Sequence, residues 1–510
     1  MAGSLNCQRF MRLYYSAARP STRFCSNDCS RKGLVLGAYI DKDKTVQLSP
    51  VAEKFNQKVQ GKLLEQIQLS SNLKPGKSFI YWGLDKDYPA VSIVGLENEK
   101  PEDDIELRNA ANENVRLAAT AGIKSLDGAG VKNIFVENFS NPESAAEGSV
   151  LASWKFQEYK AKKDELPSVQ LFESGDDSDC EKWNKGALKA EAQNIARKLA
   201  DTPANLLTPT IFADYARELL TPLGVDVKVY DEKWARDQKM FAFLSVAQGS
   251  IEPPKFLEIT YKNNDQAPYV LVGKGVTFDA GGISIKPSAN MDQMRADMTG
   301  AACVLATVYG LAKLNVPTNL KVLIPLVENL PSGSAFKPGD LIYARNGKSI
   351  CVDNTDAEGR LILADALCYS AEFKPQWVLD IATLTGAMMV ALGDVATGVF
   401  SNSNQLYNLL EKSGTETGDR VWRMPLWKSY TKKIAENPAY DLNNIGKGRG
   451  GGGCTAAAFL KEFVPEKTSW LHLDIAGVMG PENAEPYLGK GMSGRPTRTL
   501  IEFIQRQANK

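Results

Sequence analysis

Apolar runs of strand length alternate with segments of helical period along most of the chain. In the first part, strands are predicted at 33–40, 78–84, 90–96, 133–139 and 169–173, and helices at 51–70 and 104–124. In the second part, strands are predicted at 255–261, 268–275, 320–329, 377–384 and 470–478, and helices at 299–314, 357–373, 405–413, 454–463 and 496–508. This alternation is typical of α/β folds in which helices flank a mostly parallel central sheet.

A break in the pattern divides the chain into two blocks. The charged, alanine-rich segment 182–200 predicts a helix, and the two prolines of DTPANLLTPT (201–210) end it. A chain of 510 residues is also longer than one compact core organises. We therefore expect a smaller N-terminal α/β domain over 33–181, a linker helix over 182–204 and a larger C-terminal domain over 205–510.

The first 32 residues have a different composition from the rest. They contain five arginines and several serines, and Asp28 is their one acidic residue. Arg-rich, Ser-rich and acid-poor segments are typical of mitochondrial transit peptides. We expect 1–32 to be such a peptide and the protein to be mitochondrial. The alternative is a basic tail on a cytoplasmic protein.

Charge and residue usage exclude several classes of function. Lys plus Arg and Asp plus Glu both number 60, so no overall field attracts nucleic acid or a membrane surface. No apolar run reaches the roughly 18 residues that span a bilayer. The eight cysteines are scattered, which favours a reducing compartment over a disulfide framework.

The chain has one histidine, His472. This excludes a His-rich metal site and any catalytic triad that needs a second histidine, so a metal site here must be built mostly from oxygen ligands. His472 itself lies in an apolar strand, and we expect a core histidine with its hydrogen bonds satisfied.

Charged residues in the second block gather where predicted strands end and helices begin. The segment KGVTFDAGGISIK, the segment MRADM and the strand SICVDN with the following TDAEGR together supply Lys274, Asp279, Lys286, Asp297, Asp356, Glu358 and Arg360. This position is the usual ligand crevice of an open α/β sheet. A nucleotide site is disfavoured, because no phosphate-binding glycine motif opens a helix.

Simpler interpretations of the charged residues remain open. A D-x-E pair at a helix start can merely favour the helix dipole. Several carboxylates and lysines on buried strand ends, however, are costly unless they neutralise one another or bind cations. The combination therefore favours a cation site, with plain ion pairing as the alternative.

Five segments occur in the order that a known family shows. VGKGVTFDAGGISIK, MRADM, VDNTDAEGRLILADAL, ATLTGA and HLDIAGV resemble the successive signatures of the leucyl aminopeptidase family (peptidase M17), and NTDAEGRL is the most diagnostic. The resemblance covers about 200–510, and the N-terminal block resembles the variable α/β domain of that family more loosely. It implies a metallo-exopeptidase that releases N-terminal residues such as Leu and Met from short peptides, assembled as a homohexamer.

The resemblance also implies a set of metal ligands. Two divalent ions, Zn or Mn with Mg also compatible, would be held by Lys274, Asp279, Asp297, Asp356 and Glu358. Asp279 and Glu358 would bridge both ions, Lys274 and Asp297 would belong to the more exchangeable ion, and Asp356 would bind the tighter one. Lysine ligates only as the neutral amine, so we expect a lowered pKa for Lys274.

The remaining charged residues and the pocket follow from the same resemblance. Lys286 would stabilise the oxyanion of the tetrahedral intermediate, and Arg360 would hold a bicarbonate that acts as general base. Ion pairing with the ligand carboxylates is the alternative for both. The expected substrate contacts are Met294, Asn354, Thr383, Leu384, Gly386, Ala476 and Met479. Met294 and Met479 have core filling as their alternative.

A few features modify this picture. Ala280 and Thr299 replace residues common in the family, and Thr299 would tighten the exchangeable metal site. The glycine-rich stretch 446–453 is expected to form a flexible rim of the active-site mouth. Some proteins resembling this family are structural components of insect sperm mitochondria, so a paracrystalline protein with weak or no peptidase activity is the alternative function. Nucleic-acid binding is disfavoured by the balanced charge.

Overall fold

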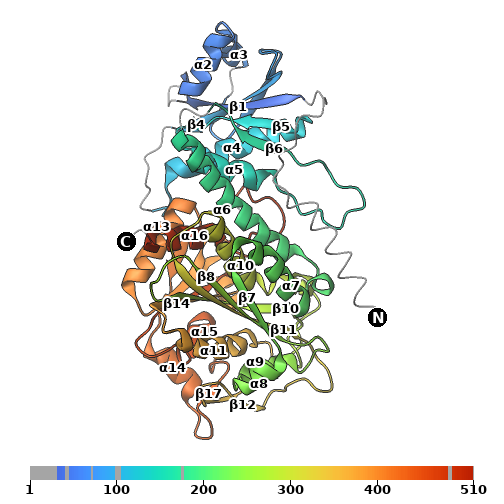
Figure 1. Cartoon of the computed structure of the whole chain (residues 1–510), viewed down its shortest axis with the longest axis vertical. Coiled ribbons are helices and arrows are strands. Elements are labelled where there is room, and N and C mark those ends of the chain that lie inside the picture. The colour runs from blue at the N-terminus through green and yellow to red at the C-terminus, as the bar shows by residue number, and fades with distance from the viewer. Residues whose placement is uncertain are drawn as a thin grey trace.

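The computed structural model describes residues 31–40, 45–70, 73–97, 105–173, 177–448, 450–480 and 485–508. It contains two large sheets with helices packed around each of them, joined by one long helix (Figure 1). Residues 1–30 of the expected transit segment lie outside the described residues. Within the described residues, no helix combines the length and the apolar character that crossing a bilayer requires.

The N-terminal unit is built on a six-stranded sheet in the order β3-β4-β1-β5-β6, with β2 beside β1. Its strands are β1 (Lys32–Ile40), β2 (Val46–Leu48), β3 (Ser78–Trp82), β4 (Ala90–Glu97), β5 (Asn133–Val136) and β6 (Ser168–Leu171). Its helices are α2 (Pro50–Lys58), α3 (Lys62–Ser70), α4 (Ala110–Gly128) and α5 (Pro142–Ser153). β1 is buried on both faces: Val35 packs in the cluster that contains α4 residues, and Leu34 and Leu36 in the cluster that contains α2 and α3 residues.

Helix α6 (Asp177–Asp201) connects the two units and contains the helix predicted at 182–200. It packs on α5 of the N-terminal unit and on α10 (Thr299–Lys313) of the C-terminal unit. In Figure 1 it runs from the upper unit down to the lower sheet. One rigid element therefore contacts both hydrophobic cores.

The C-terminal unit contains a nine-stranded sheet in the order β16-β15-β18-β14-β9-β11-β8-β7, with β10 beside β11. Its strands are β7 (Asp226–Tyr230), β8 (Lys255–Lys262), β9 (Tyr269–Gly273), β10 (Gly275–Asp279), β11 (Asn319–Asn329), β14 (Trp377–Ala382), β15 (Thr397–Ser401), β16 (Val421–Arg423) and β18 (Ser469–Asp474). The central strands β18, β14, β9 and β11 are parallel to one another. β15 is antiparallel to β18, β8 is antiparallel to β11, and β7 is antiparallel to β8. The prediction of a mostly parallel central sheet is confirmed.

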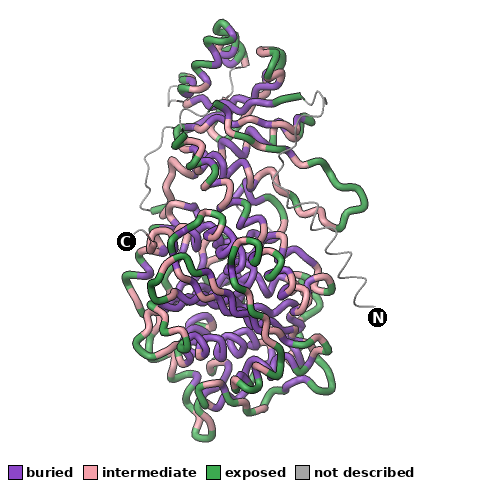
Figure 2. Tube along the Cα trace, viewed as in Figure 1, coloured by how far each residue is buried: buried purple, intermediate pink, exposed green. Residues whose placement is uncertain are grey.

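Helices cover both faces of this sheet (Figure 1). Besides α6 and α10, they are α7 (Pro209–Leu220), α8 (Glu232–Asp237), α9 (Phe241–Ala247), α11 (Gly359–Tyr369), α12 (Gly386–Leu392), α13 (Asn404–Thr417), α14 (Lys428–Ala435), α15 (Gly452–Lys461) and α16 (Thr497–Ala508). Leu379 and Ile381 of β14 pack in the cluster with α10 and α16, and Val378 and Ala382 pack in the cluster with α11 and α15. The central strands are buried on both faces, which explains their continuous apolar runs (Figure 2).

Some predicted elements have different bounds. The helix predicted at 51–70 is two helices, because Gln60 and Gly61 adopt φ values of 61° and 82° that a helix cannot contain. The strands predicted at 377–384 and 470–478 end at Ala382 and Asp474. Beyond them, the N–H groups of Leu384 and Ala476 donate to the Asp474 carboxylate instead of to a neighbouring strand.

The strand predicted in SICVDN does exist, but it is not part of the large sheet. It forms β13 (Ser349–Cys351), which pairs with β12 (Leu341–Tyr343) and β17 (Leu442–Asn443) in a separate small sheet. The expected flexible glycine rim is also partly wrong. Gly452 and Gly453 form the first turn of α15, and an added Cβ on Gly453 would lie 2.5 Å from Met388 Cε.

Candidate active site

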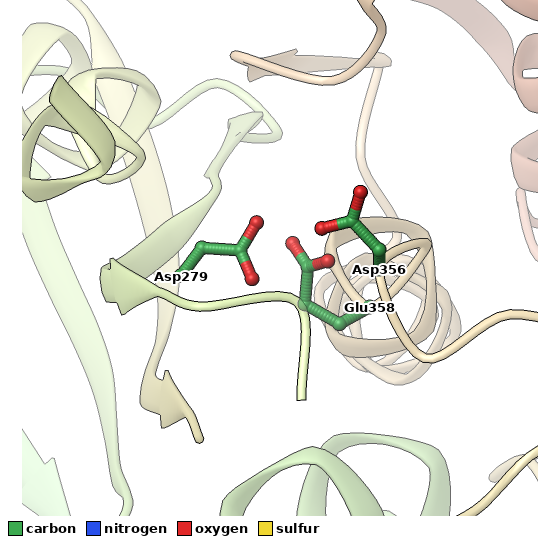
Figure 3. Close-up of side chains that lie close together, drawn as sticks. All are labelled: Asp279, Asp356 and Glu358. Atoms are coloured by element: carbon green, nitrogen blue, oxygen red, sulfur yellow. The ribbon is translucent and has the colours of Figure 1, made fainter. Parts of the chain in front are cut away.

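Three carboxylates from two segments of the chain point toward one another (Figure 3). Asp279 ends β10, Asp356 lies in the turn before α11, and Glu358 directly precedes that helix. Each offers one oxygen, and these oxygens lie within 4.8 Å of one another. The site lies beside the carboxyl ends of the parallel strands, since β9 ends at Gly273 and β14 at Ala382.

Asp279 is held by neighbours that bind only one of its two oxygens. Asn329, its partner in the β10–β11 pair, donates from Nδ2 to Asp279 Oδ1 (2.8 Å), and the Gly281 N–H donates to the same oxygen (2.9 Å). The turn needs glycine at 281, where φ is +86° and an added Cβ would lie 2.4 Å from the Ser284 carbonyl oxygen. Asp279 Oδ2 is left to face the other charged groups.

Lys274 lies between β9 and β10 and is 3 % exposed. Its amine contacts Asp297 Oδ1 (2.8 Å) and Glu358 Oε1 (3.0 Å), and it donates to the Thr383 carbonyl oxygen (3.0 Å). Thr383 also donates from Oγ1 to Asp297 Oδ1 (2.7 Å). Asp297 Oδ2 is buried without a hydrogen-bond partner among the described residues, so one oxygen of this group is available to a ligand.

Lys286 joins the other side of the cluster. Its amine lies 2.7 Å from Asp279 Oδ2 and pairs also with Asp356. The Lys286 side chain is one-fifth exposed, whereas that of Lys274 is buried. Lys286 is thus the lysine that an incoming substrate can reach.

The electrostatics of the cluster are those of crowded, buried carboxylates. Burial raises the pKa of Glu358 to about 8, and the neighbouring Asp279 adds to this effect. Burial likewise raises the pKa of Asp297 to about 6, against the opposing effect of Lys274. Four acidic groups thus share two lysines, and these groups would hold their charges more readily beside additional cations.

The lowered pKa expected for Lys274 is not found in the protein by itself. Burial alone would lower that pKa, but Asp297, Glu358 and Asp279 raise it further than burial lowers it. The expectation rested on cations next to the amine. In their absence the carboxylates determine the direction of the shift.

Arg360 lies in the first turn of α11 and is buried. It donates from Nη1 to the Asn444 carbonyl oxygen (2.8 Å), while its Nε has no hydrogen-bond partner among the described residues. Burial lowers its pKa to about 10, and Glu358 and Asp474 oppose that shift. The guanidinium remains charged at neutral pH and retains a free donor, which suits it to a small anion.

The donor set fits divalent cations. It offers carboxylate oxygens within 4.8 Å of one another, an unpartnered Asp297 oxygen and a lysine nitrogen, and no thiolate or imidazole among the residues in contact. Oxygen-rich sites of this kind suit Mn, Mg and Zn, so the residue types leave the metal open.

The expected substrate-contacting residues occupy four segments of the chain. Thr383 and Leu384 follow β14, Gly386 begins α12, and Ala476 and Met479 follow β18. Asn354 accepts a hydrogen bond from the Asp356 N–H (2.8 Å), and Met294 lies in the short helical turn Met291–Ala296 before Asp297. Met479 packs with Ala200, Ala296 and Met492, which is the packing of its core-filling alternative.

His472 and Thr299 have contacts away from the carboxylates. His472 is fully buried, and its Nδ1 lies 2.5 Å from Asp380 Oδ1, although its Nε2 has no partner within the described chain. Thr299 donates to the Ala296 carbonyl oxygen (2.6 Å). That contact stabilises the helix start and gives no support to the expected tightening of the metal site.

The sequence interpretation missed three buried polar residues around the site. Asn329 binds Asp279, Asn444 binds Arg360 through its carbonyl, and Asp474 binds the loop after β14. A polar residue ending an apolar strand is the signal that identifies Asn329 and Asp474. Asn444 carries no such signal, because it follows a strand, β17, that is only two residues long.

Two family profiles match the chain. The profile described as "Cytosol aminopeptidase family, catalytic domain" matches residues 194–501, and the one described as "Cytosol aminopeptidase family, N-terminal domain" matches residues 35–163. Together they include every candidate residue of the site.

Individual proteins agree with these profiles. The cytosol aminopeptidases of Mus musculus and Homo sapiens are 52% and 50% identical to this chain, covering 93% and 96% of it and 92% and 95% of their own lengths. Among solved structures, the bottromycin maturation enzyme BotP, also solved in complex with Mn, has a TM-score of 0.80 and 28% identity, over 94% of this chain and 100% of that one. The chain therefore belongs to the cytosol aminopeptidase family, and so to the aminopeptidases.

Proposed function

We propose that this protein is a two-metal aminopeptidase that releases N-terminal residues, Leu and Met among them, from short peptides. The observation that carries the proposal is the convergence of the Asp279, Asp356 and Glu358 oxygens within 4.8 Å. Two ions about 3.5–4 Å apart require carboxylates that bridge them, and such pairs are a common hydrolytic device.

Each ligand has a place in this proposal. Asp279 and Glu358 would contact both ions, Lys274 and Asp297 would hold the more exchangeable ion, and Asp356 the tighter one. Lys274 and Asp297 are already adjacent, at 2.8 Å. When bound, the ions supply a site for the free α-amine of the peptide, polarise the scissile carbonyl and lower the pKa of the attacking water.

Two cationic side chains complete the chemistry. The partly exposed Lys286 amine stabilises negative charge that develops on the carbonyl oxygen of the substrate, since it lies next to the acidic cluster and is reachable from solvent. Arg360 would hold bicarbonate, which would supply a general base at this position. Its unpartnered Nε supports this role.

The pocket selects the N-terminal side chain. Met294, Thr383, Gly386 and Ala476 line it, Met479 supports it from the buried cluster with Ala296, and Asn354 and Leu384 hold the peptide backbone. The lining is mostly apolar, and each methylene in such a pocket is worth about 1–3 kcal/mol, so we expect broad preference for Leu-like and Met-like residues.

The test is turnover of Leu-aminoacyl and Cys-Gly substrates with Mn²⁺ or Zn²⁺, beside Asp356→Ala. We expect this variant to lose activity by about a hundredfold or more. Asp353→Ala is the matched control, because Asp353 lies in the same loop but is exposed and bonds to Asn443 (2.7 Å). Equal turnover by wild type and Asp356→Ala would exclude the proposed mechanism.

The alternative of a structural protein makes a different prediction. It expects a folded protein with weak or no turnover under all metal conditions. The aminopeptidase names of the relatives and the full set of candidate ligands favour the enzyme. A homohexamer and mitochondrial import belong to the same proposal, and sedimentation of the purified protein and imaging of a full-length fusion test them.

A further inference from the structure

Asp474 is a buried carboxylate at the end of the central sheet. It is the last residue of β18 and is 1 % exposed. β18 is parallel to β14, with Asp474 opposite Ala382, so the loops that leave these two strands start side by side. Both loops carry residues assigned to the substrate pocket.

This one carboxylate receives hydrogen bonds from both loops. After β14, the N–H groups of Leu384 (3.2 Å) and Thr385 (3.3 Å) donate to Asp474 Oδ1, and Thr385 Oγ1 donates to Oδ2 (2.6 Å). After β18, the Ala476 N–H donates to Oδ1 (3.2 Å). The carboxylate therefore fixes the distance between the two loops.

The loop donors explain how a buried charge is tolerated here. Within the described chain, no ion pair joins Asp474 to a lysine or arginine nitrogen within 4.0 Å. Its charge is satisfied by three backbone N–H groups and one hydroxyl, and charge-assisted hydrogen bonds of this kind are about twice as strong as neutral ones. Loss of the carboxylate would leave these donors buried and unpaired.

The loop that follows β14 is held at two different points. Thr383 is hydrogen-bonded to Asp297 and Lys274, two of the proposed metal ligands. Asp474 acts one residue further along, where the chain turns from Leu384 into α12 and Gly386. The cluster therefore holds one end of this loop, and Asp474 holds the end that lines the pocket.

We propose that Asp474 is a positioning residue that sets the width of the pocket for the N-terminal side chain of the substrate by joining the 383–386 loop to the 475–479 loop. This inference rests on the proposed aminopeptidase function. Asp474 touches neither substrate nor metal in this scheme. Its removal should change which side chains fit and leave the metal ligands in place.

The experiment compares Asp474→Ala, Asp474→Asn and wild type on Leu- and Ala-aminoacyl substrates. In Asp474→Ala the ratio of kcat/KM for Leu over Ala should fall about tenfold, because a widened pocket loses contact with the larger side chain. In Asp474→Asn the ratio should stay within about twofold of wild type, since the amide oxygen still accepts the three N–H bonds. Bound metal, measured by mass spectrometry, should be equal in all three.

Asp365→Ala is the matched control. Asp365 is also a fully buried aspartate that accepts backbone N–H bonds from two segments, those of Phe243 (2.9 Å) and Arg345 (2.7 Å), but these segments carry no site residue. It should lower stability without changing the Leu/Ala ratio. An unchanged ratio in folded, metal-loaded Asp474→Ala, or an equal change in Asp365→Ala, would overturn the inference.

A binding measurement separates this inference from the proposed function. Calorimetry of leucine hydroxamate and alanine hydroxamate on the metal-loaded full chain reports the pocket without turnover. Suppose that wild type cleaves no peptide but the ratio of leucine to alanine hydroxamate affinity is about tenfold lower in Asp474→Ala than in wild type. The enzyme proposal then fails and the role of Asp474 stands. If peptides are cleaved and both ratios are unchanged, Asp474 has no part in selecting the substrate.

Discussion

At the scale of single residues, the site is set by contacts that leave each side chain little freedom. A lysine normally has many rotamers in solution, but the Lys274 amine has three fixed partners, Asp297, Glu358 and the Thr383 carbonyl. Gly359 lies against this side chain, and a Cβ there would be 2.5 Å from Lys274 Cε and 2.7 Å from Nζ. Lys274 can therefore occupy this position only because residue 359 has no side chain.

Gly359→Ala tests this contact. The added methyl group should push the Lys274 amine out of place, and a misplacement of about 1 Å at a catalytic centre can reduce kcat/KM by about a hundredfold. Thermal unfolding should change little, because Ala is the better helix former. The control is Gly128→Ala in α4, where an added Cβ meets nothing within 4 Å. Wild-type activity in Gly359→Ala would contradict the argument.

The pKa of His472 can be measured directly, because the chain has one histidine. Burial lowers the pKa of His472, but Asp380 and Asp474 raise it, Arg360 opposes them, and the net shift is upward from 6.5. A raised pKa means that the pair with Asp380 stabilises the fold fully below about pH 6.5 and that this contribution is lost as pH rises through the higher, folded-state pKa.

Carbon-13 labelling of histidine gives one NMR resonance to follow, since the chain contains one histidine. The resonance should titrate with a midpoint above pH 6.5, or keep the chemical shift of the protonated ring through neutral pH. In Asp380→Asn, the midpoint should move down, because the charge 2.5 Å from Nδ1 is removed while burial remains. A midpoint below 6.5 in wild type would show that burial dominates.

At the scale of elements, the close packing of α10 on the sheet positions Lys274, which precedes β10, and Asp297, which precedes α10. The Ala301 N–H donates to the Lys274 carbonyl oxygen (2.9 Å), so the helix start and the strand end are bonded directly. Glycines permit this approach. An added Cβ at Gly300 would lie 2.2 Å from the Ile381 carbonyl oxygen, a backbone atom of β14.

Gly300→Ala should therefore separate α10 from β14 and lower the free energy of unfolding by about 1–3 kcal/mol, as overpacking does. Gly310→Ala on the same helix is the control, because its added Cβ would meet the Ile501 side chain (2.6 Å), which can repack. Urea denaturation of both variants measures the difference. Equal losses would mean that the backbone contact at 300 has no special cost.

At the scale of the whole molecule, buried ion pairs join the two units. Glu147 of α5 contacts Arg116 Nε of α4 (2.6 Å) and Arg498 Nη1 of α16 (2.7 Å), and all three side chains are buried. Burial would raise the pKa of Glu147, but Arg498, Arg116 and Lys189 lower it below its usual range. The carboxylate is therefore charged at neutral pH, and two guanidinium groups depend on it.

Glu147→Gln should destabilise the protein by about 3–5 kcal/mol, because it removes the counter-charge that two buried arginines share and leaves each with one longer contact, Arg116 to Glu113 (3.1 Å) and Arg498 to Asp419 (3.9 Å). The matched control is Glu158→Gln, whose carboxylate is partly exposed and pairs with Lys198 (3.4 Å) and Lys163 (3.6 Å). Pairs near the surface contribute about 1 kcal/mol or less. Unfolding at neutral pH compares the variants, and similar losses in both would contradict a special role for the buried network.

The sequence predicts those parts of the fold that depend on residues close together in the chain. The strands at 33–40, 90–96 and 255–261 follow from the local apolar pattern, since most of their residues are buried on the faces of a sheet. The ends of β14 and β18 were predicted too late, because Leu384 and Ala476 bond to Asp474 in place of a neighbouring strand. For β14, that choice depends on a carboxylate 90 residues away along the chain.

The sequence by itself determined the α/β class, the candidate ligands and the family, because each of these depends on residue types at short spacings. Tertiary structure alone decided which groups meet: the Lys274 contacts to Asp297 and Glu358, and the support of Arg360 by Asn444. It also placed the Asp474 carboxylate within hydrogen-bond distance of the segments that follow β14 and β18. The partners of Lys274 and Arg360, and Thr385 as the partner of Asp474, are 23 to 89 residues away in the chain, and only the packed sheet brings them within hydrogen-bond distance.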